Sequence, residues 1–128
     1  MIVLDTHAWV WWATSSPRLS KNAAKAIHAA RGVYVSAISC WEVAMLVAKG
    51  RLIFDRDVER WLELALKLPG IELVPLSLRI AVRSASLEEG FLGDPADCII
   101  VATALEYGWV IVSKDQRIRS YPHVRAIW

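Results

Sequence analysis

The sequence predicts an α/β fold whose central sheet is parallel or mostly parallel. Short apolar runs alternate along the chain with longer segments of helical pattern, which is typical of a parallel sheet connected by helices. The first run, residues 2–4, is continuously apolar and leads straight into Asp5, as expected for a strand buried on both faces. The 128 residues are enough for one domain, residues 1–128, with a substantial core.

The segment after Asp5 is expected to hold two helices and a second strand. Residues 7–13 form a short helix that is apolar nearly all round, which indicates burial against the sheet and against another element or a second chain. The Ser-Ser-Pro sequence at 15–17 breaks this helix. Ser20 caps the next helix, which ends at Gly32, and residues 33–35 form the strand.

Two further helices complete the first half of the chain. Ser39 is expected to cap a helix over residues 40–49. The spacing of Ser39 and Glu42 is that of a capping box, in which Glu42 bonds back to the backbone of Ser39. Asp55 or Asp57 caps a fourth helix, whose apolar residues form one stripe and which ends before a Pro-Gly pair.

The second half continues the same alternation. Its expected elements are a strand at 71–74, a helix from Ser77 to about 87, a helix that begins at Asp94-Pro95 and stops at Gly108, a strand at 109–112 and, after a short turn, a strand near 124–127. Proline suits the first position of a helix and aspartate the cap before it. Right-handed crossovers between the parallel strands are the default.

Composition excludes several classes of protein. Although 55% of the residues are hydrophobic, no apolar run reaches the roughly 18 residues of a membrane span, so we expect no membrane association. The chain starts with a strand, so we expect no signal peptide. Cys40 and Cys98 provide neither a disulfide framework nor metal-ligand spacing, which favours a reduced, cytoplasmic protein with two buried thiols.

The charge pattern is neutral on the question of nucleic acid binding. A net charge of +2 and a pI of about 8.7 are compatible with it but do not argue for it. No stretch shows the combination of aromatic and basic residues that is typical of single-strand binders. Any functional signal must therefore come from particular residues.

The acidic residues carry that signal. Of the thirteen Asp and Glu, six glutamates lie on polar faces or at the ends of expected elements, and Asp55 and Asp57 are expected caps. Each of the others also has an ordinary role open to it, as a cap, a turn former or a favourable charge at a helix start. The residues that remain as candidates are Asp5, Glu42, Asp94, Asp97 and Asp115.

These five candidates are expected at one edge of the sheet. Asp5 and Asp115 each follow a buried strand, and the other three lie at the starts of helices that also begin at the carboxyl edge. If the first and fourth strands are neighbours, Asp5 and Asp115 flank the topological switch point, where open α/β sheets bind ligands. The sequence therefore predicts an acidic cleft.

Such a cleft needs a cation. Carboxylates that share a site repel one another unless something neutralises them or some stay protonated. A set of oxygen ligands suits Mg²⁺ or Mn²⁺ better than Zn²⁺. Such ions bind phosphate oxygens and activate water, and a pair about 3.5–4 Å apart can clamp both oxygens of an in-line displacement. The predicted chemistry is metal-dependent phosphodiester hydrolysis.

Four segments, taken in order, resemble PIN-domain ribonucleases, and in particular the small toxins of VapBC-type toxin–antitoxin pairs. They are residues 4–6 (LDT), 39–42 (SCWE), 93–104 (GDPADCIIVATA) and 112–115 (VSKD). The resemblance spans essentially the whole chain, and the run from 93 to 104 is its most specific part. It implies a three-layer sandwich with a five-stranded parallel sheet of order 3-2-1-4-5, flanked by helices. It also implies Mg²⁺-dependent endonuclease action on RNA.

The resemblance also assigns roles to residues. Asp5 and Asp97 match the principal metal ligands, and Glu42 and Asp115 would complete the acidic, catalytic site, while Asp94 is an extra acid that only some members carry. It further implies a homodimer and a cognate antitoxin that inserts a segment near the acidic cleft. The matching hydroxyl residues, which would orient the acids or water, are Thr6 and Ser113. Cys98 is a departure, because many members with this pattern have arginine there.

Weaker candidates and rival functions remain. Lys114 and Arg117 lie near Asp115 in sequence and are candidates for contact with RNA phosphates. His7 follows Asp5 closely, whereas the other two histidines are expected on the surface. One alternative is a PIN domain that has lost activity and serves as a binding module. Another is a receiver-like phosphoacceptor domain, although the acids at 42 and 97 would then be unexplained.

Overall fold

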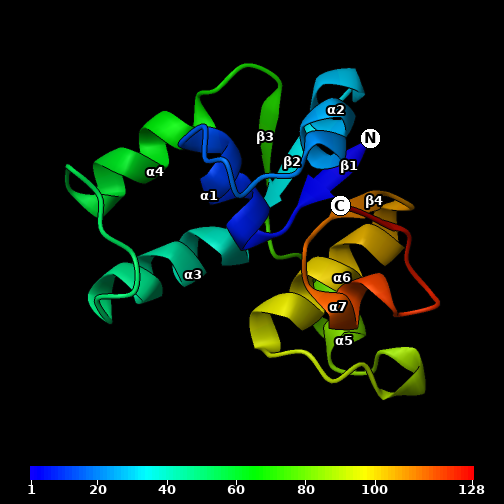
Figure 1. Cartoon of the computed structure of the whole chain (residues 1–128). Coiled ribbons are helices and arrows are strands. Elements are labelled where there is room, and N and C mark those ends of the chain that lie inside the picture. The colour runs from blue at the N-terminus through cyan, green and yellow to red at the C-terminus, as the bar shows by residue number, and fades with distance from the viewer.

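The computed structural model describes all residues, 1–128, and has one five-stranded sheet at its centre (Figure 1). All paired strands are parallel, and their order is β3-β2-β1-β4-β5. The strands are β1 (Ile2–Leu4), β2 (Val33–Ser36), β3 (Ile71–Val74), β4 (Val110–Val112) and β5 (Ala126–Ile127). The predicted class, strand order and strand positions are confirmed.

Seven helices connect and flank the strands (Figure 1). The fifth and the last of them differ from expectation. The fifth helix ends at Ser84 rather than near 87, because the hydroxyls of Ser84 and Ser86 bond back to the carbonyls of Ala81 and Val82. The last helix, a single turn, was expected only as a turn. The helices are α1 (Thr6–Ala13), α2 (Lys21–Ala29), α3 (Ala37–Ala48), α4 (Val58–Leu66), α5 (Leu78–Ser84), α6 (Pro95–Tyr107) and α7 (Gln116–Arg119), with a 3₁₀ turn at Glu88–Gly90.

The sheet lies between two layers of helices. Successive side chains of a strand point to opposite faces. Ile2 and Leu4 of β1 therefore join Trp9 in a core with α1, α2 and α4, whereas Val3 packs on the other face with residues of α6 such as Ile100. Each face has its own hydrophobic core, and the arrangement is the expected three-layer sandwich.

Helix α3 begins earlier than predicted. Ser36, the last residue of β2, caps it by accepting a hydrogen bond from the backbone N–H of Ile38 at 3.2 Å. The strand therefore passes into the helix without a loop, and Ser39, the expected cap, lies fully buried inside the first turn. The prediction of Ser39 as the cap is wrong, and its side chain is free for another contact.

Strand β1 lies at the switch point of the sheet, between β2 and β4. Its last residue, Leu4, is in register with Val35 on one side and with Val112 on the other. The three strands therefore end at the same level. Receiver domains have the strand order 2-1-3-4-5, so the receiver-like alternative is wrong.

Two smaller observations concern expectations from composition. None of the helices has both the length and the apolar character required to span a membrane. Cys40 and Cys98 form no disulfide, and both are half-buried rather than buried as expected.

Candidate functional site

A pocket of about 470 Å³ opens at the carboxyl edge of the sheet, where β1 and β4 end. All five acids singled out from the sequence line it, which confirms that the chain brings them together. Their catalytic and metal-binding roles stay predictions. The lining residues are Asp5, Thr6, His7, Trp11, Arg18, Glu42, Asp94, Asp97, Lys114, Asp115 and Arg117.

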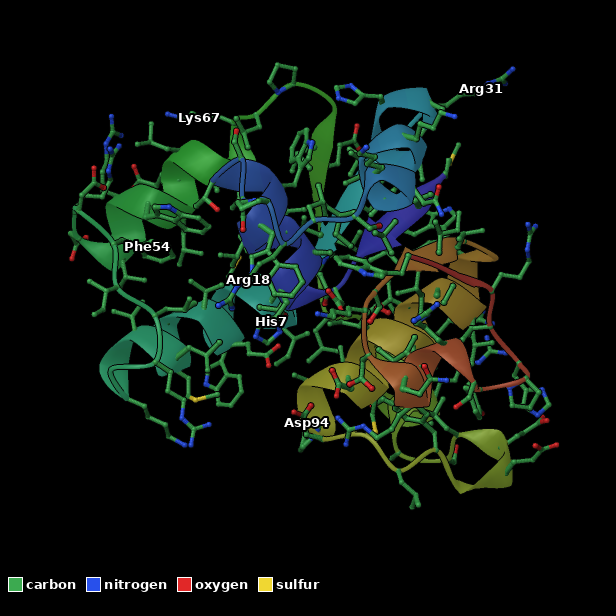
Figure 2. The ribbon with its side chains drawn as sticks, viewed as in Figure 1. His7, Arg18, Arg31, Phe54, Lys67 and Asp94 are labelled. Carbon is green, nitrogen blue, oxygen red and sulfur yellow. The ribbon has the colours of Figure 1, made fainter.

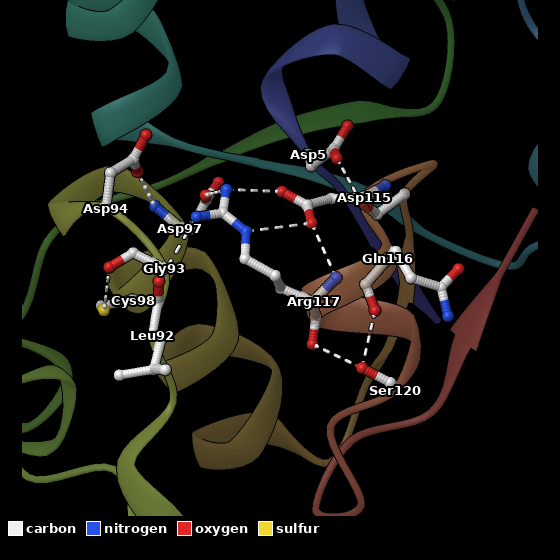
Figure 3. A network of polar contacts seen from close by, with 11 residues as sticks. Asp5, Leu92, Gly93, Asp94, Asp97, Cys98, Asp115, Gln116, Arg117 and Ser120 are labelled. Atoms are coloured by element: carbon white, nitrogen blue, oxygen red, sulfur yellow. Dashed lines mark hydrogen bonds and ion pairs between the residues drawn. The ribbon is translucent and has the colours of Figure 1, made fainter.

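Asp5 is a buried acid of the pocket and also the cap of a helix. It follows β1 directly and caps α1, and its Oδ1 accepts from the backbone N–H of Ala8 at 2.8 Å. Its Oδ2 accepts from the hydroxyl of Ser113, the residue that follows β4 (Figure 3). Burial raises the pKa of Asp5, and the bonds from Ser113 and Ala8 only partly offset that rise. The carboxyl group is thus held in one orientation by two neighbouring strand ends.

Glu42 is also buried, and a hydroxyl holds it too. Thr6 Oγ1 lies 2.5 Å from Glu42 Oε1 and 2.9 Å from Ser39 Oγ. Because a hydroxyl has one proton, Thr6 that donates to Glu42 accepts from Ser39. This series of hydrogen bonds, from Ser39 through Thr6 to Glu42, replaces the predicted capping box, in which Glu42 would have bonded to the backbone of Ser39. It gives Thr6 and Ser113 matching tasks, since each orients one buried carboxylate.

Asp97 and Asp94 come from the first turn of α6. Asp94 caps the helix, and its Oδ1 accepts from the backbone N–H of Asp97 at 2.9 Å. Partial burial and the charges of Asp94, Asp115 and Glu42 raise the pKa of Asp97 to about 7, against a smaller opposing effect of Arg117. Asp97 therefore keeps its proton at pH values where an ordinary aspartate is charged.

Arg117 bridges two of the acids (Figure 3). Its Nη2 donates to Asp97 Oδ2 at 3.2 Å and to Asp115 Oδ2 at 2.9 Å, and its Nη1 donates to the carbonyl of Leu92 at 3.3 Å. The Arg117 guanidinium lowers the pKa of Asp115 below its usual value. The positive charge beside Asp97 thus comes from Arg117 of α7. Cys98 does not line the pocket, and its thiol donates to the carbonyl of Gly93.

The pocket has the chemistry of a hard-cation site without a closed cage. No three of its His, Cys, Asp or Glu side chains are close enough together to form a ready group of metal ligands. Mg²⁺ does not need such a cage, because it keeps several waters and is commonly held by one or two carboxylates plus substrate phosphate. The oxygen donors of the pocket suit such an ion. The raised pKa of Asp97 also fits, because it reflects burial among carboxylates whose charge a cation would neutralise.

The sequence did not predict one side of this pocket. Arg18 lies in the loop between α1 and α2, and Trp11 lies on α1, where its neighbours suggested only an apolar helix. His7, a weak candidate, also lines the pocket. Figure 2 shows His7 and Arg18 close together beside α1, with Asp94 across from them. No local sequence signal could have found Arg18, because only folding brings its loop to the acids.

The metal-free protein should lose stability as the pH rises toward and through 7. Between its ordinary pKa of 3.8 and about 7, Asp97 keeps a proton in the folded state that it releases on unfolding, so stability falls with rising pH. Asp97→Asn removes this penalty. At pH 8 in EDTA we expect the variant to be more stable than wild type by on the order of 1 kcal/mol, a value reduced for solvent exposure.

Thermal unfolding of both proteins at pH 5 and pH 8 checks this prediction. The difference should be clearly smaller at pH 5 than at pH 8, because the penalty builds up from the ordinary pKa of 3.8 to the folded-state pKa of about 7. Asp55→Asn, an exposed acid outside the pocket, is the matched control and should show no growing gap. A stability difference between Asp97→Asn and wild type that does not increase from pH 5 to pH 8 would contradict the raised pKa of Asp97.

The chain is similar to known proteins over nearly its whole length. The chain matches the PIN domain family over residues 2–124. It is 37% identical over 126 residues to Ribonuclease VapC22 of Mycobacterium tuberculosis, covering 98% of this chain and 95% of that protein.

Solved structures share the fold at low sequence identity. VapBC2 from Rickettsia felis, bound to a DNA fragment from its promoter, aligns with a TM-score of 0.72 at 16% identity, covering 98% of this chain and 97% of that chain. A toxin–antitoxin complex from Klebsiella pneumoniae aligns with a TM-score of 0.68 at 22% identity, covering 97% and 95% respectively.

Proposed function

This chain belongs to the PIN-domain family, and from that premise we propose that it is an endoribonuclease, the toxin of a VapBC-type toxin–antitoxin pair. It hydrolyses RNA phosphodiester bonds in the acidic pocket with Mg²⁺, for which Mn²⁺ can substitute. The observation that carries the proposal is the convergence of five carboxylates, from four separate stretches of the chain, at the switch point of the sheet. The relative named as a ribonuclease supports the same reaction.

Asp5 and Asp97 are the proposed principal ligands of the ion, with Glu42, Asp115 and Asp94 as further candidates. When bound, Mg²⁺ lowers the pKa of a water ligand and neutralises charge on a phosphate oxygen. The pocket's all-oxygen acidic donors and the raised pKa of Asp97 support this choice of cation.

The buried half of the site is organised before substrate arrives. Asp5 is held by Ser113 and by the start of α1, and Glu42 is held by Thr6. Both carboxylates are less than a tenth exposed. Groups that are already oriented need no rearrangement during the reaction, which favours catalysis. Thr6 and Ser113 are therefore proposed as positioning residues.

The exposed half of the site is adjustable. Arg117 balances the charges of Asp97 and Asp115, and its side chain is 52% exposed, so it has room to move. A metal ion held by Asp97 would compete with the guanidinium for the charge of that carboxylate and would favour release of Arg117. The released guanidinium can then donate to an RNA phosphate, as a planar group suited to such oxygens.

The proposal includes protein partners in the cytoplasm. A cognate antitoxin is supported by the structural neighbours, several of which are toxin–antitoxin complexes. A homodimer is supported by apolar side chains left in solvent on α5, where Leu78 is 80% exposed and Val82 is 62% exposed, one helical turn apart.

The test is cleavage of RNA by purified protein free of antitoxin. Mixed tRNA, rRNA and mRNA are incubated with Mg²⁺, with Mn²⁺ or with EDTA. We expect internal cleavage with either metal and none with EDTA. Cleavage that continues undiminished in EDTA would overturn the role of the metal. No cleavage of any of the three RNA classes would leave either an enzyme with a narrow target or the inactive binding module, and the effect of Mg²⁺ on thermal stability separates these two.

A further inference from the structure

The pocket has a second wall, whose side chains are basic or aromatic rather than acidic. His7, Trp11, Arg18 and Lys114 line it, and Trp11 is the only apolar side chain in the lining. These residues come from α1, from the loop after it and from the residues after β4. No stretch of the sequence combines aromatic and basic residues in this way, so the fold assembles the combination.

Trp11 is an aromatic ring that the core does not use. Trp9 is fully buried and Trp12 packs against the same core, whereas Trp11 is half-buried and belongs to no hydrophobic cluster of the protein. Its ring is held at 5.6 Å, centroid to centroid, by His7 on one side and by Trp128 on another. The indole is thus fixed in place at the pocket wall.

The cations beside Trp11 are unpaired. Lys114 Nζ lies 6.0 Å from the centroid of the Trp11 ring, and neither Lys114 nor Arg18 forms an ion pair with any acid. Arg117, in contrast, is engaged by two carboxylates. A polyanion can approach five carboxylates only if positive groups guide its phosphates, and Arg18 and Lys114 are available for this.

We propose that Trp11, Arg18 and Lys114 form a nucleotide-binding subsite for single-stranded RNA, next to the acidic centre. A base stacks on the indole, and Arg18 and Lys114 bind the adjoining phosphates. Aromatic stacking combined with a positive groove is the general mode of single-strand binding. The inference rests on the proposed function and deepens it, because a base held here places a neighbouring phosphate at the carboxylates.

Binding of a fluorescent single-stranded RNA oligonucleotide in EDTA, where cleavage is absent, tests the subsite. Trp11→Ala should weaken binding about 10-fold, and Trp11→Phe, which keeps a ring, should stay within about 3-fold of wild type. Trp41→Ala is the matched control, because Trp41 is 56% exposed and lies outside the pocket. Arg18→Gln and Lys114→Gln should each weaken binding and reduce its dependence on salt, by about 0.7 in the log–log slope.

Several outcomes would decide the matter. Wild-type affinity in Trp11→Ala would overturn the subsite, and so would an equal loss in Trp41→Ala. Should Trp11→Ala fail to fold, unchanged affinity and salt slope in both charge variants would overturn it. Wild-type protein that binds RNA through Trp11 but never cleaves it would leave the subsite in place and refute the nuclease. Active wild-type protein with a wild-type KM in Trp11→Ala would refute the subsite alone.

Discussion

Asp97→Asn is expected to lower the rate of RNA cleavage at least about 100-fold while leaving the fold intact. The amide keeps the size of the side chain but removes the charge that is proposed to hold the metal ion. Loss of a few kcal/mol of transition-state stabilisation corresponds to such a factor. The fold should persist because Asp97 packs at the pocket wall, where its carboxylate has only one side-chain partner, Arg117.

Initial cleavage rates at saturating Mg²⁺, measured beside circular dichroism spectra, check this prediction. Asp5→Asn should have a comparable effect, since Asp5 is the other proposed principal ligand. Asp55→Asn should cleave at the wild-type rate, because Asp55 pairs with Arg56 and does not line the pocket. Cleavage at the wild-type rate by the double variant Asp5→Asn, Asp97→Asn would end the proposed mechanism.

Mg²⁺ is expected to raise the thermal stability of the wild-type protein substantially. An ion that binds only the folded state at 100 times its Kd adds about 2.7 kcal/mol to the free energy of unfolding. For a chain of this length that corresponds to a rise in Tm of roughly 10 °C. Asp97→Asn should lose most of this rise, because one proposed ligand is gone, although the variant starts from a higher stability in EDTA at pH 8.

Thermal unfolding across a Mg²⁺ titration at constant ionic strength measures the effect. Calcium-free buffers and a matched NaCl series separate specific binding from charge screening. An equal rise in wild type and Asp97→Asn would show that the ion binds elsewhere. A rise in wild type without cleavage of mixed RNA would favour an enzyme with a narrow target, whereas no rise and no cleavage would favour the inactive binding module.

The elements of the fold were largely predictable because they depend on local patterns. Short, mostly apolar runs identified all five strands, and Asp94, Pro95 and Gly108 identified the start and end of α6. The errors arose at caps, where two local solutions compete. Ser36 and Ser39 both suit a helix start, and the choice between them depends on where β2 ends. That end is set by pairing with β3, which local sequence does not report.

The acids of the candidate site were predictable, and the family resemblance named Thr6 and Ser113 as hydroxyls that orient them, but which hydroxyl bonds to which acid was not predictable. The position of Asp5 after a buried strand, and of Asp97 at a helix start, follows from the cost of burying charge and from the direction of parallel strands. The bonds from Ser113 to Asp5 and from Thr6 to Glu42 join residues 108 and 36 positions apart. Contacts of that kind leave no periodic trace in a single sequence.

The sequence by itself therefore determined the α/β class, the strands and the five acids, because periodicity and charge placement act over a few residues. Only the tertiary structure decided that Arg117 balances Asp97 and Asp115, and that Trp11, Arg18 and Lys114 form the opposite wall. The physical reason is that electrostatic and stacking interactions depend on distance in space. The parallel sheet brings strand ends and loops from across the chain within that distance at a single edge.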